Sequence, residues 1–168
     1  MRKEDSSLRK VDLWSFKSEK SGKRFIVEIE YFDSGFKGIK FYWKGVKDSK
    51  NRYSLLTHDY EPRTIIMSCI QIMLDYYKKD STCSFGFVAA PDLDQSKLNK
   101  EPNKRFRFYR RMMLSVFGNK TFYHGYDLDS SLYVLINREL IDNGTLSLES
   151  IEEEISNVYQ GTYSLQLE

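Results

Sequence analysis

The sequence has few of the residues that most often carry chemistry. Its 168 residues include two cysteines, Cys69 and Cys83, and two histidines, His58 and His124. Two cysteines are too few for a disulfide scaffold or a cysteine-rich zinc site, and each lies in an apolar run that favours burial. The histidines have no carboxylate or cysteine partners at ligand spacing, so no metal site is predicted.

Long apolar runs are missing as well. No run approaches the roughly 20 residues that a membrane-spanning helix needs, so no membrane association is expected. The N-terminal residues MRKEDSSLRK contain no apolar signal core, which predicts a cytoplasmic protein. The motifs of serine hydrolases, zinc proteases, P-loop proteins and dinucleotide-binding proteins are also absent from the sequence.

The composition is typical of one folded domain. The length suits a single core, and the chain is rich in aromatic residues, with 12 Tyr and 11 Phe. Residues 1–20 are mostly polar and charged, which predicts a polar N-terminal segment. Residues 21–168 are predicted to form a single α+β domain.

Hydrophobic periodicity predicts the elements of this domain. In chain order we expect strands 24–32, 36–44 and 53–57, a helix 63–79, a strand 82–90, a helix 103–117, strands 121–127 and 131–136, a helix 145–159 and an edge strand 162–168. The short connections between the first strands favour antiparallel pairing. The predicted fold is therefore a mixed, mostly antiparallel sheet flanked by helices. The last strand would pair within this chain or with a second one, which would make an oligomer.

The charges are unevenly placed although the net charge is only +2. Residues 97–111 contain seven bases and one acid, whereas residues 139–168 contain seven acids and no base. One interpretation is that the two segments lie close together and neutralise each other. The other is that the basic segment holds an anionic ligand or an acidic protein partner.

The helix predicted over 103–117 concentrates the positive charge. Lys104, Arg107 and Arg111 are spaced by three and four residues, so they would form one exposed stripe. The candidate ligand-binding residues are Lys104, Arg107, Arg110 and Arg111 of this helix, and Arg63 at the start of the central helix.

Binding of nucleic acid is a weaker interpretation of the same helix. Arg105 and its basic neighbours alternate with Phe106, Phe108 and Tyr109, a pattern that can pair phosphates and stack bases. The domain as a whole is nearly neutral, however, and most of these aromatic residues would face the core.

The order of the predicted elements resembles the GNAT acetyltransferase fold from the second of its strands to the end of the chain. The closest local likeness is RFYRRMMLSVFGNKTF, Arg107–Phe122, where this family has a helix with a Phe/Leu-Tyr pair followed by Gly-Phe and a final hairpin. The resemblance implies acetyl-CoA as cofactor and N-acyl transfer as activity. Tyr109 would then protonate the leaving thiolate, and His58 or Glu28 would act as the base.

The chain departs from this family at the turn that binds pyrophosphate. The family has a glycine-containing turn there, because backbone N–H groups must approach the phosphates closely. This sequence reads HDYEPRT from His58, with no glycine, with Pro62 lacking an N–H, and with Asp59 and Glu61 placed to repel phosphate.

Two functions therefore compete. The first is a non-catalytic binding protein on a GNAT-like scaffold that needs no cofactor and holds an anionic ligand or partner. The second is an acyl-CoA-dependent acyltransferase with a nonstandard phosphate turn. The chain also resembles, more loosely, small uncharacterised proteins of the Bacteroidetes, a likeness that assigns no function.

Overall fold

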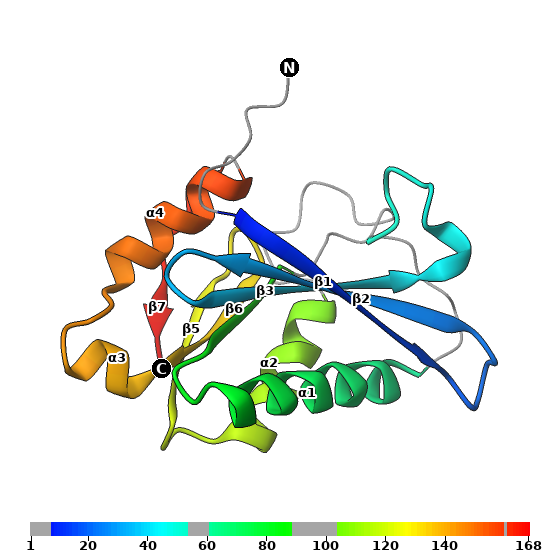
Figure 1. Ribbon diagram of the computed structural model, residues 1–168, viewed down its shortest axis with the longest axis horizontal. Coiled ribbons are helices and arrows are strands. Elements are labelled where there is room, and N and C mark those ends of the chain that lie inside the picture. The colour runs from blue at the N-terminus through cyan, green and yellow to red at the C-terminus, as the bar shows by residue number, and fades with distance from the viewer. Residues whose placement is uncertain (1–7, 54–60, 89–103, 160) are drawn as a thin grey trace.

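The computed structural model describes residues 8–53, 61–88, 104–159 and 161–168. Its elements are β1 (Leu8–Lys17), β2 (Arg24–Phe32), β3 (Phe36–Trp43), η1 (Lys44–Val46), α1 (Pro62–Lys79), β4 (Ser84–Val88), α2 (Lys104–Phe117), β5 (Phe122–Asp127), β6 (Leu132–Asn137), α3 (Arg138–Asp142), α4 (Leu148–Tyr159) and β7 (Gln166–Leu167). Within the described residues the seven strands form one mixed sheet in the order β1-β2-β3-β4-β6-β5-β7. Helices α1 and α2 lie on one face and α4 on the other (Figure 1). The predicted α+β class is confirmed.

The first three strands form an antiparallel meander. β2 shows the alternation expected of it, because Val27 and Ile29 are buried in the core beneath α1 while Glu28 and Glu30 lie on the opposite face. The turn to β3 contains Gly35, whose φ of 85° favours glycine. The strand predicted over 53–57 lies outside the described residues except for Tyr53, which is in a turn.

Helix α1 forms the crossover between β3 and β4, which are parallel. Pro62 occupies the first helical turn, where its missing N–H costs no hydrogen bond. The helix buries Ile66, Cys69, Ile70 and Met73 against the sheet. β4 lies between β3 and β6, an internal position that suits its almost entirely apolar or small residues.

The hairpin of β5 and β6 folds back so that β6 lies between β4 and β5. All six residues of β6 are buried. Helix α2, which precedes the hairpin, packs Phe106, Tyr109 and Met113 into the core that it shares with α1. The burial of these three residues and the two strands of the hairpin agree with the sequence, whereas Val116, whose helical spacing predicts the same face of α2, is exposed.

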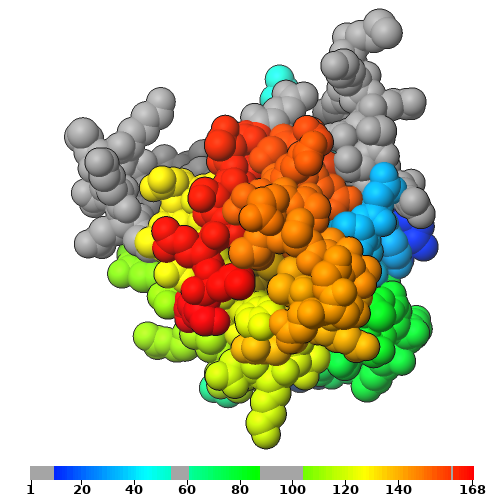
Figure 2. All heavy atoms as spheres, turned by 90° about the vertical axis from the view of Figure 1, so that its left-hand side faces the viewer, coloured from blue at the N-terminus to red at the C-terminus, as the bar shows by residue number. Residues whose placement is uncertain are grey.

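Helix α4 covers the other face of the sheet. Ile151 and Ile155 pack with Phe36, Val134 and Ile136 in a second core. Figure 2 shows α3, α4 and the C-terminal segment packed closely together on this side of the molecule. β7 pairs with β5 of the same chain, and it is shorter than the edge strand predicted over 162–168.

The start of α4 is fixed by two serines. The Ser150 N–H donates to Ser147 Oγ at 3.1 Å, and the Ser147 N–H donates to Ser150 Oγ at 3.3 Å. Ser147 therefore caps the helix, and the helix begins later than the predicted residue 145.

The sheet begins at Leu8, inside the segment 1–20 that the sequence analysis set apart. Asp12 of β1 accepts hydrogen bonds at Oδ2 from the hydroxyls of Tyr76 (2.6 Å) and Tyr31 (2.7 Å), and Trp14 Nε1 donates to the Tyr76 hydroxyl at 2.9 Å. These bonds fasten β1 to α1. The bonds from Tyr76 and Tyr31 hold the pKa of Asp12 below its usual value.

The Asp12 carboxylate should stabilise the fold in a pH-dependent way. Because its folded-state pKa is depressed, its contribution is present above the unfolded pKa of about 3.9 and is lost as pH falls through the folded value. The difference in free energy of unfolding between the wild type and Asp12→Asn should stay constant from about pH 5 to 7 and shrink below about pH 4. Urea denaturation across this range measures it.

Asp129→Asn is the matched control, because Asp129 is exposed and its carboxylate has no hydrogen bond to another described residue. It should change the unfolding free energy little at any pH. A difference for Asp12→Asn that does not depend on pH would contradict this account.

Candidate functional site

The candidate site is a pocket at the carboxyl ends of the parallel strands β3 and β4. Among the described residues the two strands pair in parallel from Phe36 and Ser84 to Ile39 and Phe87, and β4 ends at Val88. Crevices at the carboxyl ends of parallel strands are common ligand sites in open sheets. The pocket here has a volume of about 230 Å³ and is lined by Ile39, Lys40, Phe41, Tyr53, Phe87, Arg105, Tyr109, Tyr159 and Tyr163.

The pocket draws its walls from both faces of the sheet. Arg105 and Tyr109 come from α2, on the same face as α1. Tyr159 and Tyr163 come from the end of α4 and the segment after it, on the opposite face. These walls meet next to Ile39 and Phe87, the last described pair of β3 and β4.

Tyr109 lies in an aromatic wall. Its ring centroid is 5.7 Å from that of Phe87 and 6.0 Å from that of Phe41, and the residue is 6% exposed. These separations are typical of favourable tilted and edge-to-face ring pairs. Tyr109 is thus both a core residue and part of the pocket lining.

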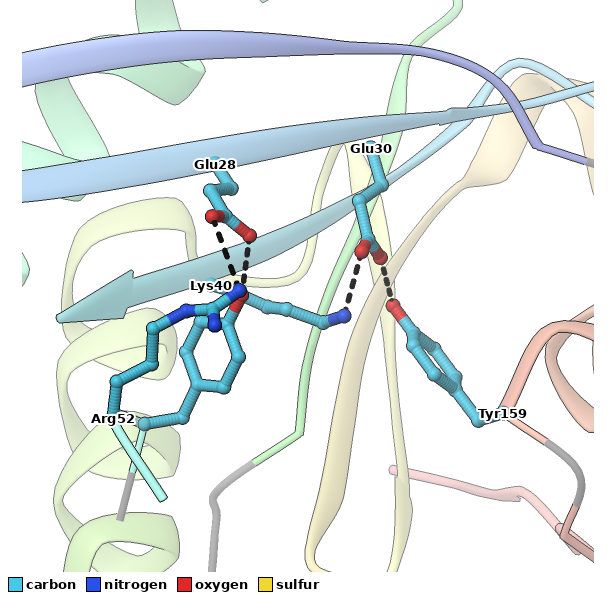
Figure 3. Close-up of polar contacts among 6 residues, drawn as sticks. Glu28, Glu30, Lys40, Arg52 and Tyr159 are labelled. Atoms are coloured by element: carbon cyan, nitrogen blue, oxygen red, sulfur yellow. Dashed lines mark hydrogen bonds and ion pairs between the residues drawn. The ribbon is translucent and has the colours of Figure 1, made fainter. Parts of the chain in front are cut away.

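An ion pair between a buried carboxylate and a partly exposed lysine lies at the other side of the pocket. Lys40 Nζ is 2.6 Å from Glu30 Oε1, and the Tyr159 hydroxyl donates to Glu30 Oε2 (Figure 3). Lys40 also lies over the Tyr159 ring, 4.7 Å from its centroid. Gly38 allows the Tyr159 hydroxyl to come this close to β3, because a Cβ at position 38 would be only 3.0 Å from the hydroxyl oxygen.

A second carboxylate, that of Glu28, is hydrogen-bonded to the Tyr53 hydroxyl. The Tyr53 hydroxyl donates to Glu28 Oε2 at 2.5 Å, and Arg52 Nη2 donates to the Tyr53 hydroxyl at 2.9 Å. Arg52 Nη2 also lies 3.9 Å from Glu28 Oε1 (Figure 3). The main-chain carbonyl of Tyr53 accepts a hydrogen bond from Arg105 Nη1, which links this cluster to α2.

The tyrosine hydroxyls beside these carboxylates stay protonated. Burial, and then the charge of Glu30, raise the pKa of Tyr159 well above its usual value. Burial, and then the hydrogen bond to Glu28, raise the pKa of Tyr53. Both hydroxyls are therefore hydrogen-bond donors at neutral pH and cannot act as bases.

The N-terminal end of α1 carries a carboxylate. Glu61 is the residue before the helix and is buried, and its side chain accepts hydrogen bonds from Ser21 Oγ at 2.6 Å and from Ser18 Oγ. A helix N-terminus usually attracts anions. A fixed carboxylate at this place opposes the binding of a second anion such as pyrophosphate.

The predicted site residues are not brought together. Lys104, Arg107 and Arg111 form the exposed stripe expected of α2, whereas Arg110 pairs with Glu168, with Nη2 2.5 Å from Oε1. Arg63 is exposed in the first turn of α1. His58 and the loop 92–103 lie outside the described residues.

The aromatic side chains of Phe106 and Tyr109 and the ring of His124 lie in the interior. Phe106 and Tyr109 are buried and are not free to stack on bases. His124 is buried, and its ring contacts the hydroxyl of Tyr133 at 2.5 Å and the carbonyl of Gly118, as expected for a structural histidine.

Sequence reasoning missed three residues that shape the pocket, namely Lys40, Tyr53 and Tyr159, and it named Arg105 only as a possible contact to nucleic acid. The alternating Glu28 and Glu30 were one signal, because buried carboxylates in a strand need donors. Nothing in the sequence, however, indicates that Tyr159, 129 positions from Glu30, supplies one of them.

In the part of the chain that is described, no group of three or more His, Cys, Asp or Glu residues is arranged to hold a metal ion. No helix there is both long and apolar enough to cross a membrane. Comparisons with protein-family models, with curated proteins and with solved structures found no match.

Removing the Tyr159 hydroxyl should destabilise the fold. Tyr159→Phe leaves one oxygen of the buried Glu30 without its donor, and such hydrogen bonds to charged groups contribute about 1.5–3 kcal/mol. Tyr163→Phe is the control, because Tyr163 lines the same pocket and its hydroxyl has no hydrogen bond to a described residue. We expect a loss of about 2 kcal/mol for the first and under about 0.5 kcal/mol for the second, measured by urea denaturation. Equal losses would contradict the assigned role of Tyr159.

Proposed function

We propose that this chain is a non-catalytic binding protein whose pocket between β3, β4 and α2 takes a small organic anion with an apolar body. The single observation that carries the proposal is the pocket itself, which lies at the carboxyl ends of the parallel strands and has aromatic walls with two cations. An anionic ligand is also the class expected from the charge pattern. The proposed binding site differs, because it lies on the inner face of α2 and not on the outer one.

The shape and walls of the pocket support a small ligand. Its volume of about 230 Å³ suits a molecule smaller than a typical drug. Phe41, Phe87 and Tyr109 offer flat apolar surfaces, on which an aromatic or short aliphatic body would pack.

The cations of the pocket support an anionic group on that ligand. Arg105 and Lys40 both line it, and none of the described lining residues is acidic. The planar fork of the Arg105 guanidinium matches the geometry of a carboxylate, and Lys40 is paired with Glu30.

The chemistry of the lining supports binding over catalysis. Among the described residues of the pocket there is no Ser, Thr, Cys, His, Asp or Glu to act as nucleophile or base. The hydroxyls of Tyr53 and Tyr159 are held by carboxylates and remain protonated.

Arg105→Gln should weaken binding of a pocket ligand. The probe is a panel of aromatic and short aliphatic carboxylates, followed by saturation-transfer NMR and titration. Loss of a charge-assisted hydrogen bond should lower the affinity of the best member by about 10-fold or more. Arg107→Gln is the matched control, because Arg107 lies on the same helix but is exposed, and it should leave the affinity unchanged.

Two outcomes would contradict the proposal. One is that no carboxylate binds at millimolar concentration. The other is that Arg107→Gln weakens binding as much as Arg105→Gln does, which would place the anion on the exposed stripe of Lys104, Arg107 and Arg111. Thermal denaturation of both variants controls for loss of fold.

A second candidate function is an acyl-CoA-dependent N-acyltransferase. Two features favour it: Tyr109 lines a pocket at the carboxyl ends of parallel strands, and the order of elements expected from the sequence resembles that of the GNAT acetyltransferases. Glu61 weighs against it, since its carboxylate lies at the start of α1, where that family holds pyrophosphate.

Calorimetry with acetyl-CoA separates the two candidates. Because Glu61 opposes pyrophosphate, we expect no binding heat with the cofactor at about 1 mM. Coenzyme A without the acetyl group is the control for unspecific binding through the nucleotide. Micromolar binding of acetyl-CoA would overturn the first candidate and establish the second, and Tyr109→Phe would then test the proton donor.

A further inference from the structure

Lys37 is a lysine in the interior of the protein. It lies on β3, is only 6% exposed, and its side chain is on the face of the sheet that α1 covers. Its Nζ is 3.2 Å from Cys83 Sγ and 3.3 Å from the carbonyl oxygen of Gly35. No described carboxylate lies within ion-pair distance of this nitrogen. A thiol is therefore the closest side-chain partner of a buried amine.

Aromatic rings complete the surroundings of this nitrogen. Lys37 Nζ lies 5.2 Å from the centroid of Tyr31 and 5.9 Å from that of Tyr76. Burying an amine without a carboxylate costs free energy, which the ring faces offset only in part. The Lys37 amine and the Cys83 thiol are thus buried side by side. Neither residue lines the pocket or takes part in the proposed ligand binding.

Cys83 is buried but lies close to the surface. It directly precedes β4, and Asp80, Ser81 and Thr82 before it are exposed. The Cys83 N–H donates to the carbonyl of Asp80 at 3.3 Å, so the thiol lies one residue inside an exposed turn. A molecule the size of hydrogen peroxide needs only a small opening of this turn to reach the sulfur.

We propose that Lys37 and Cys83 form a covalent sulfenamide cross-link when the protein meets a peroxide. Peroxide takes two electrons from the Cys83 thiolate, which becomes a sulfenic acid, and one water is released. The Lys37 amine then attacks that sulfur, an S–N bond forms, and the sulfenic oxygen leaves as a second water with one proton from the amine. Overall, an amine, a thiol and one peroxide give one sulfenamide and two waters.

The geometry favours this product over others. A sulfenic acid condenses with a nearby thiol or nitrogen, and goes on to sulfinic acid when it finds neither. Burial raises the pKa of both thiols, to about 12 for Cys69, so peroxide meets a Cys83 thiolate when the exposed turn before it opens. At Cys83 the neighbouring Lys37 amine opposes the rise in pKa. The Lys37 nitrogen is already 3.2 Å from the sulfur.

The cross-link would act on the strands that form the pocket. It joins positions 46 residues apart and encloses α1, the crossover between β3 and β4. The cross-link would therefore fix the amino-terminal ends of β3 and β4, opposite to the carboxyl ends that border the pocket. Closing a loop of this length should raise the melting temperature by roughly 5–10 °C.

Mass spectrometry of the full chain treated with hydrogen peroxide tests the proposal. A protease that cleaves after Asp and Glu gives separate peptides 34–48 and 81–92 in the untreated protein. After treatment we expect these two peptides joined, at the sum of their masses less two hydrogens. A dithiol should reverse the link and restore both peptides, with the thiol and amine regained.

Substitutions assign the link to the two residues. Cys83→Ser and Lys37→Arg should each abolish the joined peptide and the rise in melting temperature, while Cys69→Ser should retain both. If Lys37→Arg fails to fold, Lys40→Arg is the second variant. It changes the other lysine of β3, on the opposite face of the sheet, and should retain the joined peptide if the link is made by Lys37. An unlinked Cys83 sulfinic acid in the wild type, or no reaction at Cys83, would overturn the proposal.

Discussion

The parallel pairing of β3 and β4 is the constraint on which the rest of the site depends. Helix α1 joins the two strands, so their carboxyl ends lie at the same edge of the sheet, and the described register runs from Phe36 and Ser84 to Ile39 and Phe87. The pocket lies next to the last of these pairs. Side chains from α2 on one face of the sheet and from the end of α4 on the other meet there in a single pocket.

The alternation of β2 decides the electrostatics on one side of that pocket. Because successive side chains of a strand point to opposite faces, the packing that buries Val27 and Ile29 beneath α1 forces Glu30 onto the face of α4. A buried carboxylate there requires donors, since leaving it unpaired would cost about 3–5 kcal/mol. Lys40 and Tyr159 supply them, so their positions follow from the demands of the core as well as from any ligand.

The sequence predicted most of the fold because periodicity is a local property. The helical spacing of Ile66, Ile70 and Met73, and the alternation in β2, fix which side of each element faces the core. The pocket could not be predicted in the same way. It depends on contacts between distant segments, such as Glu30 with Tyr159, and periodicity gives the face of a residue but not its partner.

Helix α2 shows why the charge of a segment is a poor guide to its binding site. Arg105 and Arg107 are only two positions apart, yet a turn of 3.6 residues places Arg105 in the pocket wall and leaves Arg107 exposed. Arg110 is drawn to Glu168 of the chain's own C-terminal segment and not to the acidic helix α4. The basic residues of α2 therefore lie in three different environments: the pocket wall, the exposed stripe and an internal ion pair. A count of bases along the helix does not distinguish them. A guanidinium in the wall acts on a ligand among aromatic rings, where water screens its charge less than on the stripe. For this reason the inner face of α2 is the stronger candidate for recognition of an anion, although the outer face carries more of the charge.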